Sequence, residues 1–451
     1  MFPNHRNSAI RCASLLGRRA AICAGTVLAT VALGAWAQPL EKGGADRQTT
    51  TNPASSNVIE QAAPITLKRA FDAAWSRQPE AQSFAARQEA VEARRAVTQS
   101  WAAEPATLEL STRTDQLNRG QGAREHVLGV AIPLWLPGER SRSAAVIDAE
   151  SRSAATRVAA AKLRIAATVR DAFWAWVRAR EDLSLAQDRV SSARALAADV
   201  SRRVKAGDLA RADQHQTDGQ VAAAESALAE SQGALTAAAQ QLRALAGIAP
   251  VPGNISDIPS EALPSLPPSF ADLDAAHPHV ADLVAQAEVA RRTVALTKVQ
   301  TRANPELTLS TTRERGISAD PYQQSITLGV RVPFGSDARY RAKLAGANAD
   351  ALELESQTRL ARERVLADLD AVQQRVMSAK LVNEATARRA QLARETRGFF
   401  EKSFRAGESD LPTRLRIELE AVEAERQAAR TRIDYAAAIS ALRQTLGLLP
   451  E

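Results

Sequence analysis

The stretch LGVAIPLWLPGER, from Leu128 to Arg140, returns 200 residues later as LGVRVPFGSDAR, from Leu328 to Arg339. In both stretches apolar residues alternate with small or polar ones until a proline interrupts the pattern. Alternation with a period of two is typical of a strand with one apolar face, and proline cannot donate a ladder hydrogen bond. Each stretch is therefore predicted to be a strand that ends just before a helix.

Other landmarks recur at the same separation, which indicates an internal duplication. The matching pairs are Glu104-Pro105 with Asn304-Pro305, Thr112-Arg113 with Thr312-Arg313, Ala206-Gly207 with Ala406-Gly407, and Leu242-Arg243 with Leu442-Arg443. Each half is predicted to run helix, strand, loop, strand, long helix, tight turn, helix. The predicted strands cover residues 106–113, 125–134, 306–313 and 324–334. The fold class is mainly α with a small β part, with four strands and six helices in two repeats, 65–250 and 271–451, joined by a proline-rich linker, 251–270.

The residues from Glu139 to Ala206 contain no proline or glycine, so they predict one very long helix. Within it, apolar residues from Ile165 to Val204 are spaced alternately by four and three, which is the heptad pattern of coiled coils. Gly207 and Gly407 follow the two long helices as C-caps. Each half is thus expected to be an antiparallel helical hairpin that carries two strands at its far end.

The N-terminal residues 1–37 are typical of a cleavable export signal, with four arginines, an apolar run and a small-x-small site before Gln38. Residues 38–64 are expected to be a flexible lead-in. Both cysteines, Cys12 and Cys23, fall within the signal, so no disulfide is expected in the mature chain. Loss of the four arginines lowers the formal net charge from +7 to +3, and nucleic-acid binding is not expected because the charges are interleaved along the helices.

The alternating strands fit two architectures, which the residues alone leave open. One is a soluble antiparallel sheet that helices cover, and the other is part of a transmembrane barrel. Four strands cannot close a barrel, so a membrane location requires several chains to pool strands, and three chains would supply twelve. The residues expected at the boundary between such a barrel and the helices are Pro105, Pro133, Trp135, Pro305, Pro333 and Phe334.

The duplicated halves, the LGVxxP landmarks, the turns RVKAGDLARAD and SFRAGESDLPT, and the repeat ends LRALAGIAP and LRQTLGLLP together resemble the TolC family of outer membrane factors. The resemblance implies a homotrimer with a 12-stranded β-barrel in outer membrane lipid and an α-helical barrel that crosses the periplasm. It also implies two partners, a periplasmic adaptor (membrane fusion protein) and an inner-membrane RND-type pump. The segment IPLWLPGER is most similar to the heavy-metal efflux subgroup.

The resemblance also implies that the hairpin tips meet the adaptor. The tip residues are Arg203, Lys205, Gly207, Asp208, Arg405, Gly407 and Glu408. A plain helix–helix turn is the alternative, because glycine is needed there for a left-handed cap and the basic residues offset the helix dipoles.

A periplasmic aperture is expected shortly after the tips, at Asp213, Asp218, Arg414 and Arg416. Family members place acidic residues in both halves at this level, whereas Thr413 and Arg416 occupy the second-half positions here. Asp213 is therefore expected to pair with Arg414 or Arg416. A solvated helix face explains the same charges and stays open as the alternative.

The remaining residues indicate no catalytic, cofactor or metal site. His126 and His215 stand alone, and His277-Pro278-His279 is explained by helix initiation. The expectation is a passive, non-enzymatic exit duct of a tripartite efflux system, with heavy-metal cations as cargo. Drug efflux and type I protein secretion use the same architecture. A soluble periplasmic coiled-coil scaffold is the alternative from a different class of function.

Overall fold

The computed structural model describes residues 65–117, 120–250, 261–265, 276–335 and 337–451. The predicted export signal, the lead-in and most of the predicted linker lie outside these residues. The chain divides into two units, residues 1–58, which lie outside the described residues, and Ile59–Glu451. All that follows concerns the second unit.

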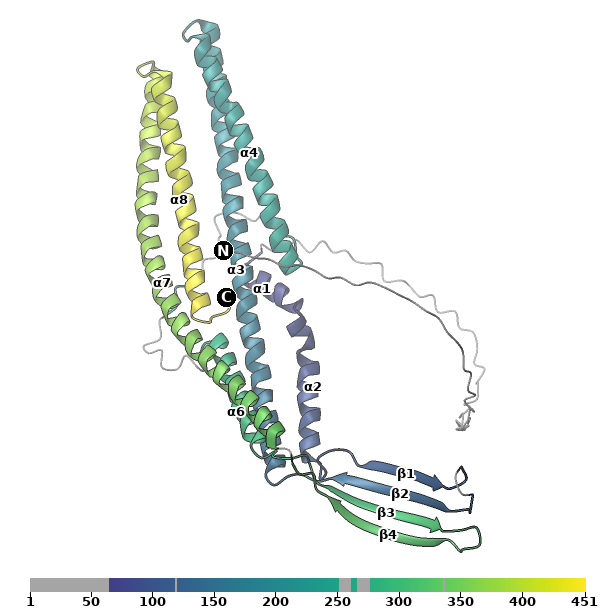
Figure 1. The fold of residues 1–451 in the computed structure, drawn as a ribbon. Coiled ribbons are helices and arrows are strands. Elements are labelled where there is room, and N and C mark those ends of the chain that lie inside the picture. The colour runs from purple at the N-terminus through teal and green to yellow at the C-terminus, as the bar shows by residue number, and fades with distance from the viewer. Residues whose placement is uncertain (1–64, 118–119, 251–260, 266–275, 336) are drawn as a thin grey trace, which may run out of the picture. The chain divides into compact units, whose positions relative to one another are not determined.

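The second unit is mostly helical, with one small sheet, as predicted (Figure 1). Its helices are α1 (Leu67–Ser76), α2 (Pro79–Gln99), α3 (Glu139–Ala206), α4 (Arg211–Ala246), α6 (Pro278–Thr297), α7 (Asp337–Ala406) and α8 (Leu411–Thr445). Among the described residues there are thus seven helices rather than the six that the sequence predicts. No helix within the described ranges is both long and apolar enough to cross a membrane.

The additional helix arises because the predicted first helix is broken. Thr66 caps α1, since its hydroxyl accepts a hydrogen bond from the Arg69 amide at 3.2 Å. The helix then stops at Ser76, and Gln78 is extended at ψ 140° before Pro79 begins α2. A residue that precedes proline is disfavoured in the helical region, so the helix must restart at the proline.

The two longest helices form the rods of the fold. α3 runs over 68 residues, from Glu139 to Ala206 as predicted, and packs along α4, while α7 runs over 70 residues and packs along α8. Every residue of the heptad seam from Ile165 to Val204 is buried or half-buried. In Figure 1 the tips of both hairpins lie at the end opposite the sheet.

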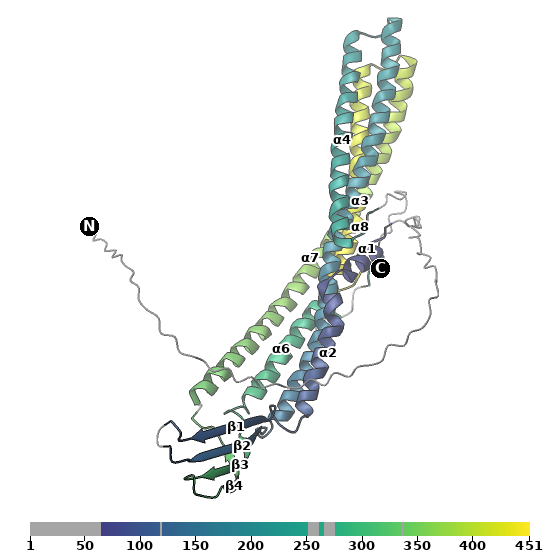
Figure 2. The same ribbon diagram turned by 90° about the vertical axis from the view of Figure 1, so that its right-hand side faces the viewer.

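Nearer the sheet, four helices form a layer in the order α2, α3, α6, α7. α2 packs on α3, α3 on α6, and α6 on α7, and Figure 2 shows them running side by side toward the strands. The largest apolar core lies where α1 meets α3 and α4, and it includes Phe71, Phe173 and Trp176. Both repeats therefore contribute helices to one continuous wall.

The sheet contains four antiparallel strands in the order β1 (Thr107–Thr114), β2 (Arg124–Pro133), β3 (Glu306–Arg315) and β4 (Gln323–Arg331). The central pair, β2 with β3, joins the two repeats. β4 ends at Arg331, three residues before the predicted end, because its partner β3 begins at Glu306, directly after Pro305. β1 and β4 each have a partner on one side within the chain.

The strand registers correct one detail of the duplication. Leu110 pairs with Leu128 in the first hairpin, and Leu309 pairs with Leu328 in the second. β4 is thus offset from β2 by 200 residues, whereas β3 is offset from β1 by 199. The predicted match of Thr112 with Thr312 is therefore wrong, and the structural equivalent of Thr112 is Thr311. An offset of 200 would place β3 side chains on the opposite face of the sheet.

Candidate functional site

One face of the sheet is apolar across all four strands. The registers place Leu108 beside Val130, Val130 beside Leu309, and Leu309 beside Leu328. These side chains are exposed to solvent in the single chain, by 64% at Leu108, 53% at Leu309 and 70% at Leu328. No described helix covers this face. The alternative of a soluble sheet predicts that helices cover it. An apolar patch that spans a whole sheet marks an interaction with lipid or protein.

The other face of the sheet carries small and polar residues. In β4 these are Gln323, Ser325, Thr327, Gly329 and Arg331, which alternate with the apolar ones. Arg331 forms an ion pair with Glu306 on β3 at 3.0 Å. A sheet with one apolar and one polar face suits a boundary between lipid and water.

Glu139 organises the junction between the sheet and the helices. Its buried carboxylate accepts hydrogen bonds from the Leu136 amide at 3.0 Å, the Asn304 side chain at 2.8 Å and the Gln300 side chain at 2.7 Å. Asn304 also donates to the Leu134 carbonyl at 3.0 Å. One carboxylate from the first repeat thus fixes the strand entry of the second, a role that the sequence pattern did not reveal.

Two other residues of the segment IPLWLPGER, Trp135 and Arg140, fix the end of α2. The Trp135 indole donates to the Ser100 carbonyl at 3.1 Å, and the Arg140 guanidinium donates to the Thr98 and Gln99 carbonyls at 2.9 and 2.6 Å. The segment is therefore explained by the junction it builds.

Of the predicted boundary residues, Phe334 is 93% exposed and Pro105 is also exposed, while Trp135, Pro305 and Pro333 are half-buried and Pro133 is buried. Trp101, which the sequence analysis did not single out, is 67% exposed at the same junction. Exposed aromatic residues at the end of an apolar strand band are typical of a membrane interface.

The hairpin tips have the geometry predicted for glycine C-caps. Gly207 and Gly407 have φ values of +88° and +78°. In each tip the residue after the glycine donates to a carbonyl five residues earlier, Asp208 to Arg203 at 2.9 Å and Glu408 to Ser403 at 3.0 Å. Lys205, Asp208 and Glu408 are exposed, and Arg405 is ion-paired with Glu401 at 2.5 Å.

Phe404 joins the two tips. Its ring packs with Leu196 and Val200 of α3 and with Leu411 and Leu415 of α8 in a small apolar cluster. The Arg203 guanidinium lies 4.5 Å from the centroid of this ring and donates to the Phe404 carbonyl at 3.2 Å. Arg203 therefore has a structural role that holds the hairpins together, and its contact with an adaptor stays a prediction.

The predicted aperture residues lie close to the tips but do not pair as expected within the chain. Asp213 accepts a hydrogen bond from the Ala210 amide at 3.0 Å and so caps α4, and Asp218 is exposed. Arg416 pairs with Glu420 at 2.9 Å. Arg414 lies over the Phe404 ring at 4.8 Å, where burial lowers the pKa of its guanidinium. Pairing of Asp213 with either arginine of a neighbouring copy stays a prediction.

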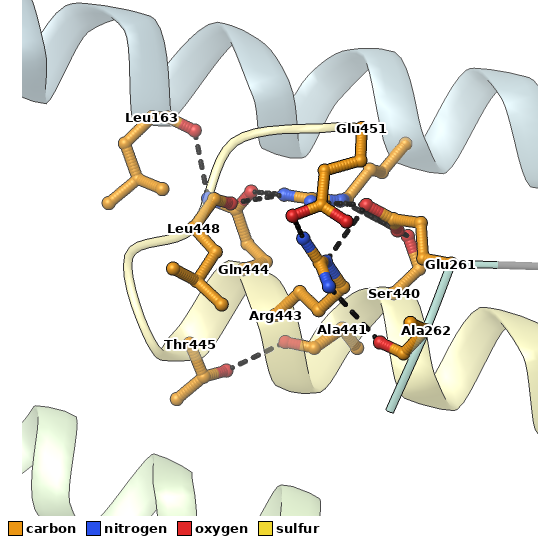
Figure 3. A network of polar contacts seen from close by, with 11 residues as sticks. Leu163, Glu261, Ala262, Ser440, Ala441, Arg443, Gln444, Thr445, Leu448 and Glu451 are labelled. Atoms are coloured by element: carbon orange, nitrogen blue, oxygen red, sulfur yellow. Dashed lines mark hydrogen bonds and ion pairs between the residues drawn. The ribbon is translucent and has the colours of Figure 1, made fainter. Parts of the chain in front are cut away.

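A buried charged cluster fixes the linker on the helices (Figure 3). Glu261, from the described part of the linker, pairs with Arg170 of α3 at 2.9 Å and with Arg443 of α8 at 3.3 Å. All three side chains are 5% exposed or less. Ser440 also donates to Glu261, and Arg443 pairs with Glu451. The cluster connects both repeats with the linker, and the sequence pattern gave no sign of it.

The histidines do not come together. The His126 ring contacts the Thr112 hydroxyl at 3.2 Å on the sheet, and His215 is exposed on α4. His277 is buried at the start of α6, where burial and then the neighbouring His279 lower its pKa, against a backbone hydrogen bond with Thr445. The described parts of the chain contain no group of three or more histidine, cysteine or acidic residues placed to hold a metal ion.

Residues 72–248 match the family model described as outer membrane efflux protein. The chain is also 30% identical over 208 residues to the cobalt-zinc-cadmium resistance protein CzcC of Cupriavidus metallidurans. The first part of the chain is thus similar to the family of outer membrane efflux proteins. The match with CzcC covers 45% of this chain and 48% of the relative, so it spans about half of the length of each.

Solved structures of outer membrane proteins and channels share the fold over most of the chain. VceC of Vibrio cholerae gives a TM-score of 0.66 at 16% identity, covering 85% of this chain and 97% of that one. CusC gives 0.70 at 13% identity, covering 86% and 94%. MtrE of Neisseria gonorrhoeae, in an open state, gives 0.67 at 15% identity, covering 85% and 89%. Because each of these structures covers about 85% of this chain, the shared fold extends beyond residues 72–248 into the second repeat.

Proposed function

We propose that this protein is an outer membrane channel subunit of a tripartite efflux system. The observation that carries the proposal is the exposed apolar face that crosses all four strands, backed by a polar face and bounded by two open edges. Open edges are not tolerated in lipid because each unpaired backbone group costs several kcal/mol of free energy there. Three copies supply twelve strands, enough for a barrel with a water-filled interior.

In this proposal the protein is a passive duct without catalytic chemistry. The four-helix wall of each copy continues the barrel into the periplasm, and the paired hairpins reach toward an adaptor and an inner-membrane RND-type pump. The exposed tip residues Lys205, Asp208 and Glu408 are the first candidates for adaptor contact. Gly207 and Gly407 serve the turn itself, and Arg203 holds the tips together.

Heavy-metal cations are the proposed cargo. The similarity of the chain, over 208 residues, to a cobalt-zinc-cadmium resistance protein supports this choice over drugs or secreted proteins. A duct needs only weak contact with its cargo, so no tight metal site is required. Growth of a deletion strain on zinc, cobalt and cadmium, with and without the gene, tests the cargo against a panel of hydrophobic drugs.

Membrane fractionation, followed by mass determination of the complex in mild detergent, tests the channel itself. A trimer in the outer membrane fraction is expected. A monomer or dimer in the soluble periplasmic fraction would overturn the proposal in favour of the coiled-coil scaffold. If the complex is an outer membrane trimer, the growth test separates metal efflux from the other channel functions. Metal efflux is expected to make the deletion strain lose metal tolerance without losing drug tolerance.

A further inference from the structure

We infer that the loop end of the apolar sheet face binds the phosphate groups of lipid A, the phosphorylated glycolipid of the outer leaflet. The site is a basic cluster on β2, on β3 and directly before β4, formed by Arg124, His126, Arg313, Arg315 and Tyr322. This inference rests on the proposed outer membrane channel and adds a lipid-binding site to its outer wall.

The strand registers place the basic cluster on the apolar face of the sheet. Arg124 lies opposite Arg315, and His126 lies opposite Arg313. Residues two apart in a strand share a face, so both pairs lie on the face that carries Leu128. The cluster continues this face toward the β1–β2 and β3–β4 loops, at the end of the sheet away from the helices (Figure 1).

The two faces of the sheet differ in charge at this level. On the polar face Arg113 forms an ion pair with Glu125 at 3.9 Å, and Glu125 lies opposite Glu314. The apolar face instead holds the three arginines of the basic cluster, none of which forms an ion pair with a described carboxylate. Because like charges directly opposite each other destabilise a sheet, this segregation indicates a negatively charged partner outside the chain.

Each hairpin loop holds one aspartate, and both aspartates are used within their own loops. Asp115 accepts hydrogen bonds from the amides of Gln121 and Gly122 at 2.8 and 3.2 Å. Asp320 accepts a hydrogen bond from the Ile317 amide at 3.3 Å. The loops therefore give the basic cluster no counter-charge.

Tyr322 holds two guanidinium groups together at the edge of the apolar face. The guanidinium carbons of Arg313 and Arg315 lie 4.7 and 4.9 Å from the centroid of its ring. The Nε of Arg315 donates to the Gly122 carbonyl at 3.1 Å, which fixes the side chain and leaves its terminal N–H groups for a ligand. Guanidinium groups bind phosphate oxygens with two parallel hydrogen bonds, so this pair suits a phosphate.

The level of the basic cluster fits a membrane boundary. The apolar pattern of β4 runs from Ile326 to Phe334, about 27 Å at ~3.4 Å per residue, comparable with the ~25 Å apolar band of outer membrane barrels. Phe334 and Trp101 are exposed at the helix end of this band, and Tyr322 lies at the opposite end. In the proposed channel the helices lie in the periplasm, so the cluster meets the headgroups of the outer leaflet, where basic residues bind anionic groups.

Binding of purified lipid A to the detergent-solubilised trimer, measured by native mass spectrometry, tests the inference. The test variant R124Q/R313Q/R315Q removes the arginine charges of the basic cluster. The matched control R113Q removes an arginine from the polar face at the same level. Dephosphorylated lipid A and inorganic phosphate are the control ligands.

We expect the triple variant to bind lipid A at least ~10-fold more weakly than the wild type, because it loses several charge-assisted hydrogen bonds. R113Q should bind lipid A like the wild type, and the wild type should bind dephosphorylated lipid A at least ~10-fold more weakly. Equal binding of the two lipids by the wild type, or equal weakening in R113Q, would overturn the lipid site. Displacement of lipid A by inorganic phosphate would assign the cluster to a free anion and would also overturn it.

The outcomes distinguish failure of this inference from failure of the proposed function. A wild-type outer membrane trimer without preference for the phosphorylated lipid leaves the channel standing and removes only the lipid site. Absence of any outer membrane trimer would overturn both. If the triple variant does not assemble, the comparison of the two lipids on the wild type still decides, and R124K/R313K/R315K should assemble and retain binding because it keeps the charges.

Discussion

Leu328 and Thr327 are neighbours in β4 whose side chains point to opposite faces of the sheet. Replacing Leu328 with arginine sets a charge on the apolar face, where lipid contact is proposed, at a cost of about 2–4 kcal/mol. Thr327→Arg puts the same charge on the polar face and is the matched control. We expect L328R to reduce the amount of trimer in the outer membrane and T327R to leave it near the wild-type level. Equal levels of the two variants would contradict a lipid-facing assignment.

Glu261 is a single buried carboxylate between two buried guanidinium groups. Its replacement by glutamine leaves Arg170 and Arg443 without a full counter-charge, and breaking a buried pair costs about 3–5 kcal/mol. We expect E261Q to lower the free energy of unfolding by that amount, measured by circular dichroism of the detergent-solubilised protein. Glu423→Gln breaks the exposed pair with Arg426 and is expected to change the stability by less than about 1 kcal/mol.

His277 predicts a pH dependence of stability. Its pKa in the folded chain lies below the ordinary 6.5, so the folded state favours the neutral ring. Stability is therefore full above the unfolded-state pKa and falls as the pH drops below it, because the unfolded chain binds the proton more readily. We expect H277Q to lose less stability than the wild type between pH 7.5 and 5.5, because this window brackets the ordinary pKa of histidine.

The control for this prediction is His215→Gln, which changes an exposed histidine on α4. Its thermal unfolding should follow the wild-type pH profile. If H277Q and H215Q give the same profile, the acid sensitivity has another source than the buried ring.

At the scale of elements, the hairpin turns depend on their glycines for backbone reasons alone. A Cβ at Gly207 or Gly407 would meet no other atom within 4 Å, but both residues have positive φ. Alanine at either position should therefore destabilise its hairpin by about 1 kcal/mol. Gly219→Ala, in the interior of α4, should instead stabilise by about 0.5–1 kcal/mol, and thermal unfolding of the three variants provides the comparison.

The long elements were predictable because strong local signals define them. α3 begins and ends where the sequence places it, since no proline or glycine interrupts it and Gly207 ends it. The strands also lie where alternation predicts them, within one to three residues. The break between α1 and α2 was missed because the apolar periodicity runs through it, although Pro79 gave the signal.

The contacts between distant segments were not predictable. The register of β3 was misjudged by one residue because Thr112-Arg113 and Thr312-Arg313 look alike but are not equivalent. The roles of Glu139 and Glu261 depend on partners from 91 or more residues away, and no local pattern records such pairing. Arg203 was assigned to the tip by the turn motif, but its contact with Phe404 required the packing of one hairpin on the other.

At the scale of the whole molecule, each copy has two open sheet edges, one on β1 and one on β4. In the proposed barrel each edge pairs with a different neighbouring copy. An arrangement of this kind closes only when every copy offers both edges. A chain whose β1 edge is blocked could still join one neighbour through β4, but the ring would stay open. A variant with one blocked edge is therefore expected to be dominant over the co-expressed wild-type protein.

The size of this dominant effect follows from the fraction of rings that contain no blocked chain. If blocked and intact chains are made in equal amounts and mix freely, only about one eighth of three-copy rings contain no blocked chain. Co-expression should therefore lower metal tolerance far below the half expected for independent subunits. Because the barrel closes only through the edges of its own copies, a single blocked copy is enough to inactivate the whole ring.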